Sequence, residues 1–338
     1  MDYKEIESLK TVLTNALNIV IIPHKNPDGD AIGSCVALNE ILKSLGKNSN
    51  IITPNDFPDF LKWMDKKNEI KIFEENINKN IKLVEDSDLI FTLDFNSLSR
   101  IGKMEQYVCN SNALKVMIDH HQEPDNYADF IYSDVSMSST CEMVYHFLDK
   151  MSLLKNLNAK IASCIYTGIM TDTGSFRFPL TSEITHNIIS KLIKHGADGN
   201  KIHDLVYNNN SIEKVLLLSH TLSNIVVEKK YNTAYMFLTQ EDLNKFNFKK
   251  GDTEGIVNYG LSIKKIKFSV IFIENRIDNI IKISFRSKDN FDVNKFAKDN
   301  FKGGGHINAA GGVSYDNLND TISNFLDKLK NYKDNLCD

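Results

Sequence analysis

The chain has 338 residues, of which 42% are hydrophobic and 25% are charged, and its formal net charge at pH 7 is −4. This composition excludes a disordered polymer, and a length beyond about 250 to 300 residues favours two domains over one. It also argues against binding to long duplex nucleic acid, because neutralising many phosphates requires a surplus of Lys and Arg. We therefore expect any nucleic-acid partner to be short.

The five cysteines, an odd number without a C-x-x-C pair, fit neither a disulfide framework nor a structural zinc site. The first residues are charged and lack the apolar segment of a signal peptide, and no run of about 18 apolar residues occurs. We expect a cytoplasmic protein without a membrane partner.

Short apolar runs alternate with helical periodicity in the first half of the chain, which is typical of βα units around a parallel sheet. The runs predict strands at 18–23, 88–94 and 115–120, with a helix at 31–46 after the first strand. The pattern from about 139 to 220 is largely helical. Ligands bind at the carboxyl ends of strands in open α/β sheets, so the polar residues after these three strands should converge.

Strand patterns return after about residue 225, and a closing helix is predicted near 318–331. The sequence therefore predicts an α/β protein with a first domain at 1–195, built on a parallel sheet flanked by helices. A helical connection at 196–224 leads to a smaller α/β domain at 225–338. We expect a cleft between the two domains.

His24, Asp28 and Asp30 follow the first predicted strand in the sequence HKNPDGD, where Pro27 and Gly29 favour a tight loop. One imidazole and two carboxylates form a hard ligand set that suits Mn²⁺ or Mg²⁺. The alternative is a turn with helix-capping aspartates, in which Asp30 is the N-cap of the next helix.

Further metal-ligand residues end the next two predicted strands, namely Asp94 and the run Asp119-His120-His121. Asp172 follows an apolar helical segment, where a solvated aspartate at a helix end is the alternative. The full candidate set is His24, Asp28, Asp30, Asp94, His120 and Asp172. Two ions about 3.5 to 4 Å apart that share one carboxylate would use this set, lower the pKa of a bridging water and stabilise charge on phosphoryl oxygens.

A glycine cluster in the second half is a candidate anion site, formed by Gly303, Gly304, Gly305 and His306. Backbone N–H groups without neighbouring side chains can approach an anion closely, above all if a helix starts at about residue 306. Arg286 ends the strand predicted at 280–287, and its guanidinium can bind a phosphate bidentately. An ordinary loop and an exposed strand-end arginine are the alternatives.

The fragments HKNPDGD, FTLD, IDHH and TDTG, followed by GGGHINAAGG, resemble the DHH/DHHA1 phosphoesterase superfamily. Their order and the chain size resemble its bifunctional oligoribonuclease and pAp phosphatase (nanoRNase) branch, over roughly residues 15 to 330. The resemblance implies His24 and Asp28 as ligands of one ion, Asp30, His120 and Asp172 as ligands of the other, and Asp94 as the bridge.

The same resemblance implies that His121 lies beside the scissile phosphate, so that Asp94, His120 and His121 are the catalytic residues. It also implies that Arg286 and the cluster from Gly303 to His306 hold the far end of the substrate. Asn26 and Arg100 are weaker candidates for phosphate contacts. Two Mn²⁺ ions are the implied cofactors, with Mg²⁺ or Co²⁺ as alternatives.

The resulting hypothesis is hydrolysis of short oligoribonucleotides or linear dinucleotides to mononucleotides, and of 3'-phosphoadenosine 5'-phosphate (pAp) to AMP, by in-line attack of a bridging hydroxide. Its partners are short RNA or DNA pieces or small nucleotides, and a homodimer is the default assembly of soluble oligomers. The alternatives are a DHH-type inorganic pyrophosphatase, a cyclic dinucleotide phosphodiesterase and a catalytically idle nucleotide-binding regulator.

Overall fold

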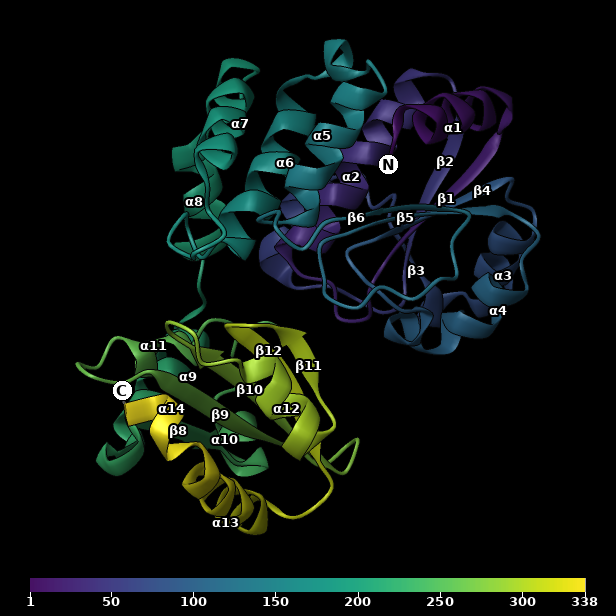
Figure 1. Cartoon of the computed structure of the whole chain (residues 1–338). Helices are drawn as coiled ribbons and strands as arrows, with labels where there is room; N and C mark the ends of the chain where they lie inside the picture. Colours follow the sequence, from purple (N-terminus) through teal and green to yellow (C-terminus); the bar gives the residue numbers. More distant parts are fainter. Residues whose placement is uncertain (338) are drawn as a thin grey trace. The chain divides into compact units, whose positions relative to one another are not determined.

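The computed structural model describes residues 1–337, so that Asp338, the last residue of the predicted second domain, lies outside the described residues. The chain divides into two units, the first at Met1–Asn209 and the second beginning at Asn210 (Figure 1). Within residues 1–337, no helix combines the length and the apolar character needed to cross a bilayer.

The first unit alternates strands and helices. Its elements are α1 (Tyr3–Asn15), β1 (Asn18–Pro23), α2 (Gly29–Ser44), β2 (Asn48–Thr53), β3 (Lys71–Ile72), α3 (Ile77–Glu85), β4 (Leu89–Leu93), α4 (Glu105–Asn110), β5 (Leu114–Asp119), β6 (Phe130–Ser133), α5 (Thr140–Lys150), α6 (Ala159–Asp172), α7 (Glu183–Lys194) and α8 (Gly199–Tyr207). Short 3₁₀ helices lie at Asp59–Asp65, Phe73–Glu75, Leu98–Met104 and Leu154–Asn156.

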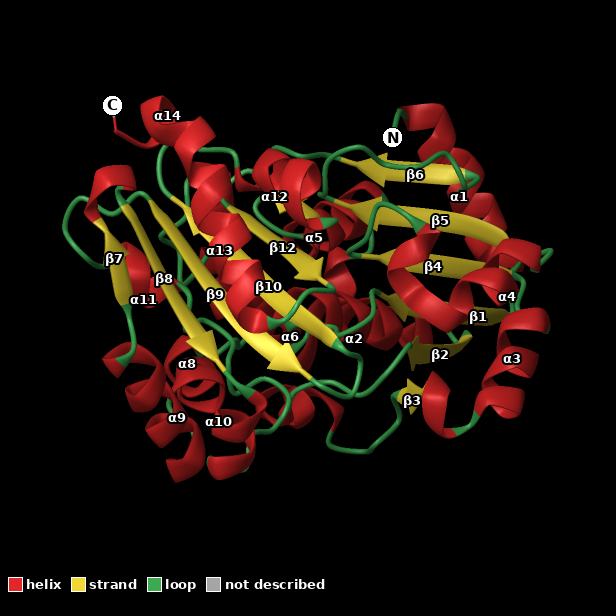
Figure 2. Ribbon diagram, turned by 90° about the horizontal axis from the view of Figure 1, so that it is seen from below, coloured by secondary structure: helices red, strands yellow, loops and turns green. Residues whose placement is uncertain are grey.

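All strands of this unit pair in parallel in the order β3-β2-β1-β4-β5-β6 (Figure 2). The three strands predicted from the sequence are therefore the neighbours β1, β4 and β5, which confirms the predicted α/β class with a parallel sheet. The chain leaves β1 toward β2 on one side, and β4 lies on the other side. This reversal of direction is the place where open α/β sheets bind their ligands.

Helices cover both faces of this sheet because successive strand residues point to opposite sides. Ile19 and Ile21 of β1 pack into the core formed with α1, α2, α5 and α6, whereas Val20 and Ile22 pack on the side of α3 and α4 (Figure 1). Helix α2 is buried along nearly its whole length because it also packs against α6. A Cβ on Gly33 would lie 2.5 Å from the carbonyl oxygen of Cys164, so this glycine permits the close helix contact.

The second unit has a mixed sheet in the order β11-β12-β10-β9-β8-β7, in which only the β8–β9 pair is parallel among the described strands (Figure 2). Its elements are α9 (Ile212–Ser223), β7 (Val226–Glu228), β8 (Thr233–Leu238), α10 (Gln240–Lys245), α11 (Asn258–Leu261), β9 (Phe268–Asn275), β10 (Ile280–Ser287), α12 (Val293–Phe301), β11 (Gly304–His306), β12 (Ala309–Ser314), α13 (Leu318–Leu329) and α14 (Lys333–Cys337). Short 3₁₀ helices lie at Lys229–Tyr231 and Lys330–Tyr332.

Aromatic side chains fill one face of the second sheet. Phe268 packs edge-on to Phe296 of α12, and Phe272 packs edge-on to Phe325 of α13. The opposite face is aliphatic, with Met236 and Ile271 in a core shared with α9 and α10. Each sheet thus has its own core.

The condition that would strengthen the glycine cluster as an anion site, a helix that starts at about residue 306, is not met. Gly304–His306 forms strand β11, which pairs antiparallel with β12. A Cβ on Gly303 would lie 2.0 Å from the carbonyl oxygen of Gly311, and a Cβ on Gly305 would lie 2.4 Å from that of Ala309. The glycines therefore permit close approach between two backbone segments of a hairpin.

Candidate metal centre

The loops that follow β1, β4 and β5 bring metal-ligand side chains to one edge of the first sheet. His24 comes directly after β1, Asp94 directly after β4, and Asp119-His120-His121 at the end of β5. Asp94 has φ 66°, a left-handed conformation that is costly for a residue with a side chain. Its N–H donates to the carbonyl oxygen of Ile118 at 3.1 Å, which fixes this conformation against β5.

The turn between β1 and α2 is organised by Asp28 and not by Asp30. The Asp28 side chain is the N-cap of α2 and accepts from the N–H groups of Asp30 and Ala31 at 3.0 and 3.1 Å. The alternative in which Asp30 caps the helix is therefore wrong, because α2 begins at Gly29 and Asp30 lies within its first turn. The Asp30 side chain is left for other partners.

The six candidate ligands form two groups, within each of which the ligand atoms lie within 4.8 Å of one another. The first group is His24, Asp28 and Asp94, and the second is Asp30, His120 and Asp172. Asp94 lies between them, because Nε2 of His24 is 3.5 Å from its Oδ2 and Nε2 of His120 is 3.7 Å from its Oδ1. The structure thus brings together the residues proposed for two adjacent sites.

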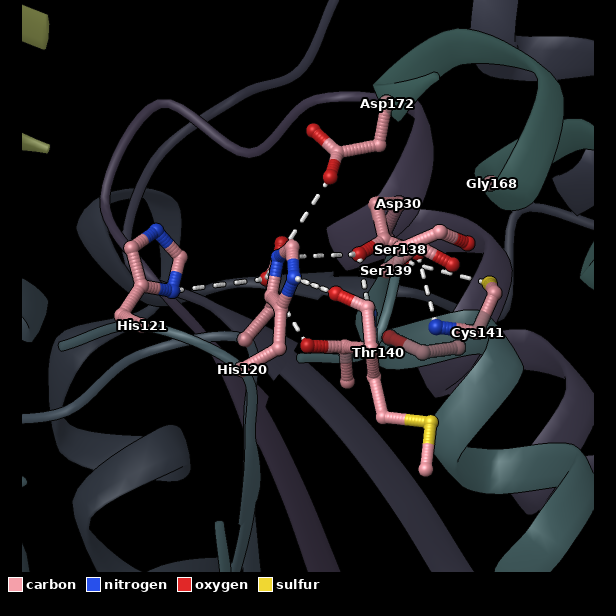
Figure 3. Close-up of polar contacts among 12 residues, drawn as sticks. Asp30, His120, His121, Ser138, Ser139, Thr140, Cys141, Gly168 and Asp172 are labelled. Carbon is pink, nitrogen blue, oxygen red and sulfur yellow. Dashed lines mark hydrogen bonds and ion pairs between the residues drawn. The ribbon is translucent and has the colours of Figure 1, made fainter. Parts of the chain in front are cut away.

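Asp172 reaches this centre from the last residue of α6, and Figure 3 shows its carboxylate pointing at the imidazole of His120. Its Oδ2 is 3.4 Å from Nε2 of His120, and its side chain is 26% exposed. Asp30, Asp94 and His120 are at most 2% exposed. The centre is therefore buried on the sheet side and accessible beside Asp172.

Backbone carbonyls orient the two ligand histidines. Nδ1 of His24 lies 2.9 Å from the carbonyl oxygen of Lys25, and Nδ1 of His120 lies 3.1 Å from that of Met137. Because a carbonyl oxygen only accepts, Nδ1 carries the proton in both rings and Nε2 faces the carboxylates. This arrangement is common for metal-ligating histidines.

The N-terminal turn of α5 holds two of the aspartates, a role that the sequence reasoning missed. Thr140 N–H donates to Oδ2 of Asp30 at 2.6 Å, and Cys141 N–H donates to Oδ1 at 2.8 Å. The Thr140 hydroxyl donates to Oδ1 of Asp94 at 2.9 Å. The run Ser138-Ser139-Thr140 could have been recognised as a helix start, with Ser139 as its N-cap. That its N–H groups hold Asp30 could not be recognised, because every residue except proline has a backbone N–H.

Charge crowding perturbs the titration of the metal-free centre. Burial and the charges of Asp94 and Asp172 raise the pKa of Asp30 well above its ordinary value. Burial alone would lower the imidazole pKa values, but the carboxylates outweigh it and raise the pKa of His24 and of His120. For Asp94, burial alone would raise the pKa, but the hydrogen bond to His24 and the charges of the histidines outweigh it and lower the pKa. Protons thus balance part of the negative charge where divalent ions could replace them.

His121 has a separate partner. Its Nδ1 lies 2.7 Å from Oδ1 of Asp119, a fully buried carboxylate that also accepts the His121 N–H at 3.1 Å. Nδ1 of His121 is 3.9 Å from Oδ1 of Asp94, which places the imidazole beside the ligand groups. Asp119 therefore fixes the orientation of the ring.

The weaker candidates of the first unit lie on the adjoining loops. Asn26 is exposed, has φ 58° and exchanges amide hydrogen bonds with Asn55 at 2.8 Å. The carbonyl oxygen of Arg100 accepts the Lys25 N–H at 2.8 Å, and the Arg100 charge acts on His24 to lower its pKa. Both lie near the loop that carries His24.

The second unit holds the remaining candidates in one row of its sheet. Arg286 of β10 and His306 of β11 are both in register with Ala309 of β12. Residues in one row of an antiparallel sheet point to the same face, so Arg286 and His306 share a face on either side of a small residue. Gly303, Gly304 and Gly305 precede His306 in the same hairpin.

The donor set of the first unit fits divalent metal ions. Carboxylate oxygens and imidazole nitrogens suit Mn²⁺, Mg²⁺ and Co²⁺, and the sulfur atoms nearby belong to buried cysteines outside both groups. Four carboxylates without cations would repel each other strongly at neutral pH. The arrangement can therefore hold metal ions where a phosphate group could be activated.

Comparison with known families gives two matches. The model of the DHH family, N-terminal domain, matches residues 18–169, and the model of the DHHA1 domain matches residues 228–334. The bifunctional oligoribonuclease and PAP phosphatase NrnA of Bacillus subtilis is 30% identical over 315 residues, which cover 91% of this chain and 94% of that protein.

Solved structures show the same fold. The crystal structure of an exopolyphosphatase-related protein from Bacteroides fragilis is 40% identical, with a TM-score of 0.94 over 100% of this chain and 98% of that one. RecJ from Thermus thermophilus, solved in complex with Mn²⁺, is 12% identical, with a TM-score of 0.57 over 99% of this chain and 55% of that one. The latter likeness concerns the fold alone.

Proposed function

We propose a function on the premise that the chain belongs to the DHH family, whose N-terminal domain and DHHA1 domain it carries in that order. As a member of this family it is a phosphoesterase, a hydrolase of phosphate esters. The proposed substrates are short oligoribonucleotides, including linear dinucleotides, and pAp. The similarity to a named oligoribonuclease and PAP phosphatase along 91% of the chain supports this choice.

The observation that carries the proposal is the convergence of two His/Asp groups on Asp94 at the ends of β1, β4 and β5. His24 and Asp28 would hold one ion, and Asp30, His120 and Asp172 the other. Asp94 would contact both. Ions bound there would activate a water molecule for in-line attack and stabilise negative charge on the phosphoryl oxygens. We propose Mn²⁺ as the ion to test first, with Mg²⁺ and Co²⁺ as alternatives.

The other residues of the first unit would position the substrate. His121, whose Nδ1–H donates to Asp119, would present Nε2 to the phosphate or to the leaving oxygen as a hydrogen-bond donor or acid. Arg100 and Asn26 would contact phosphate oxygens from the adjoining loops. Asp119 would keep the imidazole of His121 in one orientation.

The second unit would bind the nucleotide at the end away from the reacting phosphate. Arg286 and His306 share one face of its sheet, and the glycine hairpin offers backbone donors without side chains in the way. A guanidinium and an imidazole on one face suit a phosphate or a base edge. Substrates of a few nucleotides would satisfy such an end-binding site, whereas pyrophosphate has no nucleotide to offer it.

The proposal is tested with the purified full chain, Mn²⁺ and labelled substrates. Dinucleotides to pentanucleotides, pAp, inorganic pyrophosphate and a cyclic dinucleotide are compared at equal concentration, with Asp94→Asn as the inactive reference. We expect mononucleotides from the short RNAs and AMP from pAp. Asp94→Asn should lose about 10²- to 10³-fold in activity, as for other groups that stabilise transition-state charge.

Two results would contradict the proposal. Rapid hydrolysis of pyrophosphate with no attack on nucleotides would support the pyrophosphatase alternative. Tight nucleotide binding without release of any product would support an idle regulator.

A further inference from the structure

Glu142 of α5 is a buried carboxylate that no ligand group uses. It is 2% exposed, and within residues 1–337 its partners are hydroxyl and amide donors. Its Oε2 accepts the Ser138 N–H at 3.3 Å, the Ser138 hydroxyl in a short hydrogen bond, and the Thr185 hydroxyl at 3.0 Å. Burial of a carboxylate among neutral donors is costly. Its position therefore calls for a physical reason.

Helix capping does not supply the whole reason. Ser139 and Glu142 have the S-x-x-E spacing of a capping box, and the Ser139 hydroxyl does accept the Glu142 N–H at 3.0 Å. In a capping box the glutamate would return to the N–H of Ser139. Here the Glu142 side chain instead binds Ser138, one residue earlier, and Thr185 on α7. It therefore ties the loop before α5 to the start of α7.

The tethered loop supports the metal centre directly. Met137, next to Ser138, accepts the Nδ1–H of His120, and Thr140 and Cys141 just beyond it hold both oxygens of Asp30. Figure 3 shows Ser138, Ser139, Thr140 and Cys141 gathered around Asp30 beside His120. A shift of Ser138 would move these donors and acceptors together.

We propose that Glu142 is a positioning residue of the metal centre, which through Ser138 and Thr185 holds the loop that orients His120 and Asp30. This inference rests on the proposed two-metal function. All three donors converge on one oxygen, so a glutamine can reproduce the contacts with its amide oxygen although it lacks the charge. An alanine cannot reproduce them.

The test is Mn²⁺ binding by the full chain, followed through the electron paramagnetic resonance signal of free Mn²⁺ at fixed pH. We expect Glu142→Ala to bind Mn²⁺ about 10-fold more weakly, at the lower end of the loss known for direct hydrogen-bond partners of metal ligands, because Glu142 acts on His120 and Asp30 through the loop. Glu142→Gln should lose clearly less affinity than Glu142→Ala, because its amide oxygen can accept from the same three donors. Asp149→Ala, an exposed carboxylate on the same helix, is the matched control and should leave the affinity unchanged.

Thermal melting in EDTA separates positioning from stability. If Glu142 merely supports the helix, Glu142→Ala lowers the melting temperature but keeps the Mn²⁺ affinity, and the inference is overturned. Equal loss in Glu142→Gln and Glu142→Ala also overturns it, because the charge alone would then matter. If Glu142→Ala does not fold, Ser138→Ala and Thr185→Val replace it, with weakened binding expected in both and unchanged binding in both contradicting the inference.

Failure of the proposed function looks different in the same experiment. If the unsubstituted chain binds no Mn²⁺, Mg²⁺ or Co²⁺, the two-metal proposal fails. If the unsubstituted chain binds metal and Glu142→Ala binds it with the same affinity, the positioning role fails and the two-metal proposal stands.

Discussion

Replacing Asp94 by asparagine should abolish most of the stabilisation that Mn²⁺ gives to the first unit. Asp94 is 2% exposed and lies within 3.5 to 3.7 Å of a nitrogen from each ligand group, so its loss should weaken both sites. An ion at 100 times its dissociation constant stabilises a folded protein by about 2.7 kcal/mol, hence about 5 kcal/mol for two ions. For a unit of this size each kcal/mol shifts the melting temperature by about 2 to 4 °C, which predicts an increase of about 10 to 20 °C.

The assay is thermal melting by circular dichroism with Mn²⁺ or with EDTA. In EDTA, Asp94→Asn should itself cost about 1 to 3 kcal/mol, because His24 loses a charged acceptor in a buried place. The informative quantity is therefore the metal-induced shift of each protein and not its absolute melting temperature. Asp149→Asn is the control and should keep the full shift. The reasoning is refuted if Asp94→Asn keeps more than half of the shift seen in the unsubstituted chain.

Three further outcomes are expected. Gly168→Ala should destabilise the first unit by about 1 to 3 kcal/mol and weaken Mn²⁺ binding, because the new Cβ would lie 2.2 Å from Sγ of Cys141 and 2.7 Å from Oδ1 of Asp30. An unchanged melting temperature would contradict this close packing. Mn²⁺ binding should release protons and tighten as pH rises through and above 6.5, because an imidazole with a raised pKa, such as that of His120, stays protonated to higher pH and must lose its proton when the metal binds. Calorimetry in buffers of different ionisation enthalpy measures the proton release, and an affinity that does not change with pH would contradict the prediction. Arg286→Ala should raise KM for dinucleotides about tenfold or more with a smaller change in kcat. The control Arg276→Ala should leave KM unchanged, because the Arg276 guanidinium already pairs with Glu241 and Glu274, and equal effects of the two substitutions would argue against an end-binding site in the second unit.

The sequence predicted the strands that matter most for the site because they are buried on both faces. β1, β4 and β5 are central in the parallel sheet and appear as near-continuous apolar runs that end in polar loops. β6 is a short edge strand with one buried residue in four, and β2 begins with polar residues, so neither gives such a run. The strands missing from the prediction are therefore β6 at one edge of the sheet, and β2 and the two-residue β3 on the other side of β1.

The candidate site was also predicted only in part. Side-chain ligands such as Asp94 and His120 are recognisable because their residue types carry the chemistry. Asp30 and His120 are held by backbone groups of Met137, Thr140 and Cys141, which any residue could supply. Asp94 is held by the hydroxyl of Thr140. The glycine cluster could not be assigned to one local structure from the sequence, because polyglycine permits close backbone approach equally at a helix start and in a hairpin.

An anomalous difference map from crystals grown with Mn²⁺ tests the metal centre most directly. We predict two peaks in the first unit about 3.5 to 4 Å apart, one bound by His24 and Asp28, the other by Asp30 and His120, with Asp94 bound to both. A single peak, or ions held away from Asp94, would contradict the two-metal centre on which the proposed hydrolysis depends.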